Sequence, residues 1–268
     1  MNNATPKDLH VALGHVLARE APSHSAGVSS MLLFNEAVLL RERIGDWLAV
    51  SRPGCSERFW VPSGAVREVP INAGPVYVCI SRSTHGYFDA DLRRPAKHVS
   101  MSTRIVPIQS TTVTAPNQMD QVALFQDASQ LWFPAIHFTS WPCTLNPSDL
   151  AQKFIEVPYM YHGRSAEGID AFGLVQVVCS TVGAVFYDFV NIATRFQPLA
   201  EGVAMTKGDI VKLGEVLGIY TGDGCVVYAS DRSASVVVEL IDVIMDQTRE
   251  PLNSLRYWPV QSMAAFKS

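Results

Sequence analysis

The chain has 268 residues, of which 48% are hydrophobic and 17% charged, and its formal net charge is −4. The length leaves room for more than one domain, since domains usually hold about 100–150 residues. The net negative charge and the lack of a long basic run do not indicate a surface that binds nucleic acid. Contact with nucleic acid inside an assembly stays open. A charged fraction this low is one expected sign of a surface that is buried by a partner.

Chemistry that depends on cysteine or on metals has little support in the sequence. The cysteines are odd in number and form no CxxC pair, which argues against a disulfide scaffold and a zinc ribbon and fits a reducing compartment. They are Cys55, Cys79, Cys143, Cys179 and Cys225. No HExxH motif, acidic-histidine cluster or glycine-rich phosphate loop occurs. We therefore expect no metal and no cofactor.

Targeting signals are also missing. No run of 18 apolar residues occurs, so we expect no membrane insertion. The segment Met1–Glu20 lacks a basic region followed by an apolar one, which predicts no secretory signal. These features favour the cytoplasm or the interior of an organelle, and a presequence that has already been removed stays open.

The front of the chain, up to about Cys143, is predicted to be all β. Its apolar runs are short and bounded by turn residues, which is typical of strands in small barrels or sandwiches; examples are Met31–Phe34, Ala37–Leu40 and Trp47–Val50. Two stretches are alike: FWVPSGAVRE at Phe59–Glu68 and LWFPAIHF at Leu131–Phe138. Their similarity predicts two duplicated units.

The back of the chain begins with two predicted helices. Pro147–Val157 has the pattern of a short helix, with Ser148 as its N-cap and Pro158 ending it. After a glycine-rich loop, Ala171–Phe186 is apolar nearly all round and is expected to be a central, buried helix. Asp170, directly before it, suits an N-cap.

Short β-branched segments follow, and they predict a sheet. They are Gly208–Leu213, Val216–Thr221, Cys225–Ser230, Ser235–Ile241 and Arg256–Val260. Asp223 and Gly224 give a strong hairpin signal between two of them. A buried helix leading into an antiparallel sheet makes an α+β domain.

The order of these elements resembles the NlpC/P60 cysteine peptidases. Their motif Gly-Ile-Asp-Cys-Ser-Gly-Leu-Val-Gln is matched at seven of nine positions by GIDAFGLVQ at Gly168–Gln176. An upstream stretch, PYMYHGRS at Pro158–Ser165, is similar to the family's Pro-Tyr-Leu-Trp-Gly-Gly-Arg-Ser. Downstream, the family's Gly-Asp-Leu-Val and His-Val-Gly-Ile strands correspond to Gly208–Val211 and Val216–Ile219.

The front half looks like the two SH3-like barrels that precede the peptidase in bacterial members. The similar stretches are Leu17–Glu36 for the first barrel, and Ile80–Pro95 with Ser100–Ile108 for the second. The resemblance therefore implies a first SH3-like β-barrel with an N-terminal arm at 1–72, a second at 73–143, and an α+β, papain-like NlpC/P60 domain at 144–268.

The resemblance fails at the residues that carry the family's chemistry. Those enzymes need a thiolate at a helix N-terminus, a histidine that moves protons and a polar group that orients the histidine. The corresponding positions here hold Ala171, Val216 and Tyr228, and Phe172 replaces the motif serine. Three losses argue against a single laboratory substitution. Residues 163–268 contain no histidine that could substitute.

The remaining motif residues predict a vestigial cleft. Tyr159 corresponds to a tyrosine that lines the family's substrate cleft, His162 replaces a glycine, and Asp170 matches the motif aspartate. A loop histidine bonded to backbone is the simpler interpretation of His162, with ligand contact as the alternative. We expect a largely apolar lining, partly filled by the ring of Phe172. The lining residues would be Tyr159, Ala171, Phe172, Val216 and Tyr228.

The sequence therefore predicts a catalytically inactive NlpC/P60-like pseudoenzyme. Its expected role is that of a structural or binding subunit, held by other protein subunits in a larger assembly. Two alternatives stay open: an active peptidoglycan stem-peptide endopeptidase, and a protein that binds peptidoglycan fragments without cutting them.

Overall fold

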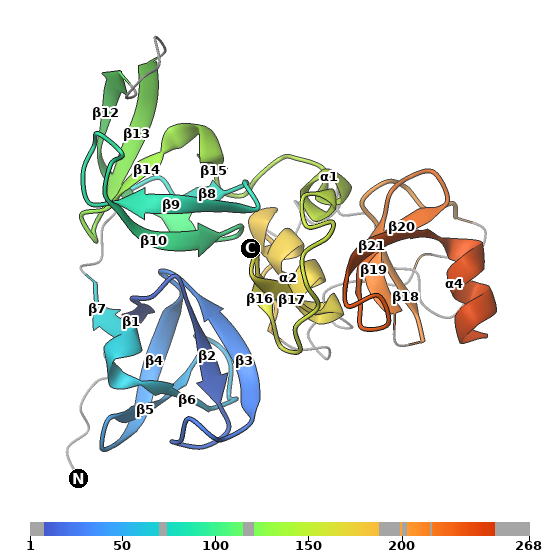
Figure 1. Cartoon of the computed structure of the whole chain (residues 1–268), viewed down its shortest axis with the longest axis horizontal. Helices are drawn as coiled ribbons and strands as arrows, with labels where there is room; N and C mark the ends of the chain where they lie inside the picture. The colour runs from blue at the N-terminus through green and yellow to red at the C-terminus, as the bar shows by residue number, and fades with distance from the viewer. Residues whose placement is uncertain are drawn as a thin grey trace. The chain divides into compact units, whose positions relative to one another are not determined.

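The computed structural model of the chain describes residues 8–69, 74–114, 121–187, 199, 203–214 and 216–249. The chain divides into two compact units, Met1–Trp141 and Pro142–Ser268 (Figure 1). The first is built from strands, and the second combines helices with an antiparallel sheet. Among the described residues, no helix is long and apolar enough to cross a membrane.

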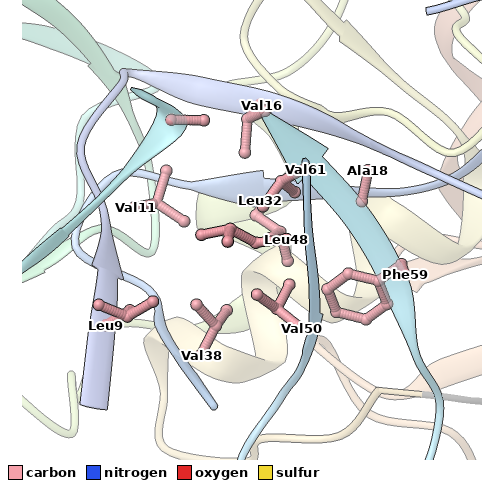
Figure 2. Packing of buried hydrophobic residues seen from close by; sticks show 11 residues of the cluster. Leu9, Val11, Val16, Ala18, Leu32, Val38, Leu48, Val50, Phe59 and Val61 are labelled. Carbon is pink, nitrogen blue, oxygen red and sulfur yellow. The ribbon is translucent and has the colours of Figure 1, made fainter. Parts of the chain in front are cut away.

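The first unit begins with a seven-stranded antiparallel sheet in the order β3-β2-β6-β5-β4-β1-β7. Its strands are β1 (Asp8–Val11), β2 (His15–Arg19), β3 (Val28–Leu33), β4 (Ala37–Ile44), β5 (Trp47–Ser51), β6 (Phe59–Pro62) and β7 (Val66–Glu68). Alternate residues of these strands point inward and form one apolar core, which includes Val16, Leu48, Val50 and Phe59 (Figure 2). The short apolar runs in the sequence predicted these strands, and successive side chains of a strand point to opposite faces.

Two smaller sheets complete the first unit, in the orders β10-β9-β14-β13-β12 and β11-β8-β15. The strands are β8 (Tyr77–Cys79), β9 (Ser83–Tyr87), β10 (Pro95–Ser100), β11 (Arg104–Ile105), β12 (Pro107–Thr114), β13 (Gln121–Asp127), β14 (Trp132–Pro134) and β15 (Phe138–Ser140). They surround a second apolar core that contains Phe34, Cys79, Phe133 and Phe138.

The two similar sequence stretches have similar backbones. In the first, β6 passes into a 3-10 turn, η1 (Ser63–Ala65), and then into β7. In the second, β14 passes into η2 (Ala135–His137) and then into β15. Pro62 and Pro134 precede the two turns with φ of −58° and −59°. Proline fixes this angle, so the same residue sets the same turn twice.

The second unit contains α1 (Pro147–Gln152), α2 (Ala171–Thr181), α4 (Ile241–Thr248) and the two-stranded β16 (Arg164–Ser165) and β17 (Gly168–Ile169). Its main sheet has the order β18-β19-β20-β21, with β18 (Ile210–Leu213), β19 (Val216–Tyr220), β20 (Cys225–Ser230) and β21 (Ser235–Leu240). The four predicted strands are confirmed. The predicted fifth strand, Arg256–Val260, lies outside the described residues.

Both predicted helices end earlier than expected, and the first has a different cap. Asn146, not Ser148, is the N-cap of α1, because its side chain accepts a hydrogen bond from the amide of Ser148 at 2.8 Å. The second helix, α2, stops at Thr181 instead of continuing to Phe186. Gly183 follows with φ of +99°, a left-handed conformation that ends a helix.

Candidate functional site

The N-terminus of α2 is organised by Asp170. Its Oδ1 accepts a hydrogen bond from the amide of Gly173 at 2.6 Å, which confirms the predicted N-cap. Its Oδ2 accepts another from the amide of His162 at 2.8 Å. One carboxylate therefore fixes both the first turn of the helix and the loop that precedes it. This loop conformation places His162 at φ of +60°.

The pKa of Asp170 is raised above its ordinary value because its side chain is buried. Hydrogen bonds from the amides of Gly173 and His162, and the charges of His162 and Arg164, oppose that shift without cancelling it. Asp170 is thus held by backbone donors inside the protein, which is a structural role. Among the described residues, no group of three or more histidine, cysteine or acidic side chains could hold a metal ion.

Tyr159 and His162 lie beside this helix start. Tyr159 forms a parallel bridge with Ile169, and its amide donates to the carbonyl of Ala234 at 2.8 Å. Burial raises the pKa of Tyr159, and the negative charges of Asp170 and Asp231 raise it further. The ring of His162 lies 4.0 Å from that of Tyr161, centroid to centroid.

Ala171 and Phe172 are the first two residues of α2, and both are half-buried. The ring of Phe172 meets that of Phe186 edge to face, with centroids 5.8 Å apart. Aromatic pairs favour this geometry. The side chain at the motif-serine position therefore packs against an apolar partner from beyond the end of the same helix.

Val216 and Tyr228 lie on neighbouring strands and on one face of the sheet. In the β19–β20 register, Gly218 pairs with Tyr228, so Val216 is two residues away on the same face. Both belong to an apolar cluster with Ile241 and Ile244 of α4. The hydroxyl group of Tyr228 donates a hydrogen bond to Oε2 of Glu239 at 2.6 Å. Burial raises the pKa of Tyr228, and the hydrogen bond to Glu239 raises it further.

The five residues predicted to line one cleft thus fall into two environments. Tyr159, Ala171 and Phe172 lie at or beside the start of α2, whereas Val216 and Tyr228 pack with α4. The alternate strand residues, such as Leu217, Ile219 and Val227, are buried on the opposite face of the sheet. The helix α2 packs against β19 and β20, and the strands lie between α2 and α4 in Figure 1.

Three of the thiols, those of Cys143, Cys179 and Cys225, have environments that disfavour the thiolate. Burial raises the pKa of Cys143 and of Cys225, and Asp223 raises that of Cys225 further. Cys179 is completely buried in the middle of α2, and its pKa is raised far above the ordinary value. A thiolate is the reactive form of cysteine, so none of these three groups is poised as a nucleophile.

Sequence reasoning missed Glu239 and Asn146. An acidic residue in the otherwise β-branched SVVVEL segment was a signal for a specific partner, but the partner depends on strand register. Asn146 carried a clearer signal, because asparagine directly before proline fits the N-cap and first helical position.

Comparison with known proteins gives structural matches only. No family model and no curated protein matches the sequence. A solved NlpC/P60 family protein from Bacillus cereus superposes with a TM-score of 0.73 at 14% identity, covering 88% of this chain and 95% of that one. The chain has the fold of NlpC/P60 proteins.

A second solved structure, an NlpC/P60 endopeptidase from Photobacterium damselae subsp. piscicida, agrees with that assignment. It matches with a TM-score of 0.62 at 13% identity and covers 93% of this chain and 72% of its own. The NlpC/P60 fold expected from the sequence motifs is therefore confirmed, in a structure that is rich in strands.

Proposed function

We propose that the chain is a catalytically inactive protein with the NlpC/P60 fold that serves as a structural or binding subunit for other proteins. The observation that carries the proposal is the start of α2. Asp170 caps the helix as a motif aspartate would, and the next residue, where the helix dipole would stabilise a thiolate, is Ala171. A methyl group cannot attack an amide carbon.

The strand positions support the same proposal. Val216 has no titratable group, and Tyr228 directs its hydroxyl group to Glu239 within an apolar cluster. General-base catalysis needs a group that exchanges a proton near the operating pH. The raised pKa of Tyr228 keeps it protonated at neutral pH.

The catalytic side chains are missing at Ala171, Val216 and Tyr228, but the start of α2 and the sheet are intact. This combination favours a role in which the folded surface binds other proteins. In the proposed architecture the first unit is a pair of SH3-like barrels, each carrying the same strand, 3-10 turn and strand. Exposed apolar side chains such as Ile136, which is 80% exposed on η2, are available for contact with protein partners.

The test is hydrolysis of a peptidoglycan stem peptide, Ala–γ-D-Glu–diaminopimelate, followed by mass spectrometry of the products. Wild-type protein and Ala171→Cys are expected to release no product, because the variant restores the thiol without a base. Turnover by the wild type would reject the proposal and favour a cell-wall peptidase. Calorimetry with the same peptide separates the remaining roles: no heat supports a scaffold, and binding without cleavage would point to a non-cleaving sensor.

A further inference from the structure

The first unit contains a pocket of about 330 Å³ that no part of the proposed function uses. It is lined by residues of β1 and β4 of the seven-stranded sheet, of β11, and of the end of β13. Its lining residues are His10, Asn35, Ala37, Val69, Val76, Arg104, Ile105, Val106, Asp127 and Ala128. The volume is at the lower end of the range of small-molecule sites, which is about 300–1,000 Å³.

Arg104 supplies a cation to this pocket, and no described residue is its counter-ion. Its guanidinium lies over the ring of Trp141, with the Cζ atom 4.8 Å from the ring centroid. Within the described part of the chain, Arg104 makes no ion pair. Because only the flat face of the guanidinium stacks on the ring, the N–H groups along its edge can still donate. Two such N–H groups can bind one carboxylate through a pair of parallel hydrogen bonds.

His10 adds a polar side chain to the lining of the pocket. Its Nδ1 lies 2.9 Å from the carbonyl oxygen of Asn35, which requires Nδ1 to carry the proton and donate. The other ring nitrogen, Nε2, has no partner among the described residues.

Asp127, the one carboxylate of the lining, is already occupied. Its Oδ2 accepts from Asn35 Nδ2 at 2.9 Å, and its Oδ1 accepts from the amide and hydroxyl groups of Ser129. Asp127 is 2% exposed. It therefore does not provide the missing counter-ion for Arg104.

Two further cations lie close to Asn35 of the lining or to its neighbour Phe34. Arg67 donates to Oδ1 of Asn35 at 2.8 Å, and Lys97 and Arg67 both lie over the ring of Phe34. Burial lowers the pKa of both groups, and the charge of Arg67 lowers that of Lys97 further. This part of the unit thus has more positive charge than Asp127 offsets, and an anionic ligand would relieve the repulsion.

We propose that this pocket binds a small organic anion with one carboxylate and a compact apolar body. The carboxylate pairs with the guanidinium of Arg104. The apolar body lies against Val69, Val76, Ile105 and Val106. Inorganic anions satisfy only the charged half of such a site.

The test is a calorimetric titration of the full chain with N-acetyl-leucine as the probe. N-acetyl-leucine amide, which lacks the charge, and inorganic phosphate, which lacks the apolar body, serve as comparison ligands. We expect millimolar binding of the acid, and at least about tenfold weaker binding of the amide and of phosphate, a difference of roughly 1.4 kcal/mol.

Three variants decide whether the binding belongs to this pocket. Arg104→Gln is expected to weaken N-acetyl-leucine binding about tenfold, whereas Arg93→Gln, which removes an exposed arginine paired with Asp91, leaves it unchanged. Ala128→Leu fills the pocket without changing its charge and is expected to abolish binding. It keeps the test decisive if Arg104→Gln fails to fold. Absence of binding by the wild type, equal binding of acid and amide, equal binding of acid and phosphate, or binding that both pocket variants retain overturns the proposal.

Discussion

The hydroxyl group of Tyr228 on β20 donates a 2.6 Å hydrogen bond to Oε2 of Glu239 on the adjacent strand β21. The tyrosine is 2% exposed, so removing its hydroxyl group leaves the carboxylate without a donor at the edge of an apolar cluster. We expect Tyr228→Phe to lower the free energy of unfolding by about 1 kcal/mol in urea titrations. The exposed Tyr161 provides the matched control; equal stability of Tyr228→Phe and Tyr161→Phe would show that the hydrogen bond contributes nothing.

Asp170 makes the stability of the second unit depend on pH. Its pKa is raised by burial, so the folded chain keeps this proton at pH values where the unfolded chain has lost it. The contribution of Asp170 is greatest below the ordinary aspartate pKa, and it falls as pH rises through the raised value. We expect wild-type protein to lose stability relative to Asp170→Asn over that window and to reach a constant difference above it. Thermal unfolding of both proteins from acidic to neutral pH measures this, and a difference that grows in the opposite direction would contradict the burial argument.

Gly173 is needed where the first turn of α2 meets the preceding loop. A Cβ at this position would collide with the carbonyl oxygen of Gly163, which is backbone and cannot move aside alone. Gly173→Ala is therefore expected to destabilise the protein by about 1–3 kcal/mol, despite the better helix propensity of alanine. Gly64→Ala is the control, because a Cβ there meets no atom within 4 Å. If both variants unfold at the same denaturant concentration, the close approach is not a constraint.

Arg52 and Glu36 form a buried ion pair in the first unit. The two side chains are 2% and 10% exposed, their charged atoms are 2.7 Å apart, and Arg52 also donates to Ser30 and to the carbonyl of Met31. Removing one partner leaves the other charge buried, so Glu36→Gln is expected to cost about 3 kcal/mol of unfolding free energy.

The double variant distinguishes a lost attraction from a buried charge. Combining Glu36→Gln with Arg52→Met removes the uncompensated charge, and we expect it to recover part of the stability lost in Glu36→Gln. A double variant less stable than the single one would contradict this account. The exposed pair Arg93–Asp91 is the control, and Asp91→Asn should leave the unfolding transition unchanged.

Local patterns predicted the elements of the second unit well. Short β-branched runs separated by Asp223 and Gly224 predicted β19 and β20, and Gly222 and Gly224 adopt φ of +101° and +86° in the connecting turn. The cap at Asp170 was also predictable, since a capping carboxylate acts within three residues. The end of α2 was not recognised, because the apolar character of the sequence continues past Gly183 while the backbone turns there.

Relationships between distant segments could not be predicted. Which face of β20 carries Tyr228 follows from register, but the helix that covers this face depends on where the later segment Ile241–Thr248 packs. The pocket in the first unit combines His10 with Asp127, which are far apart in sequence and lie on different sheets. Only the folded chain shows that Arg104 lines this space and that none of the described carboxylates pairs with it.

The most direct test of the proposed loss of activity compares the wild type with the triple variant Ala171→Cys, Val216→His, Tyr228→His on the stem peptide. The wild type is expected to release no product, since it has neither a nucleophile at the start of α2 nor a histidine on β19 or β20. The triple variant is expected to release no product either, because Val216 and Tyr228 pack with α4 whereas Ala171 begins α2 on the other face of the sheet. Cleavage by the triple variant would contradict that placement. Product formation by the purified wild type, at a rate that further purification does not change, would contradict the account.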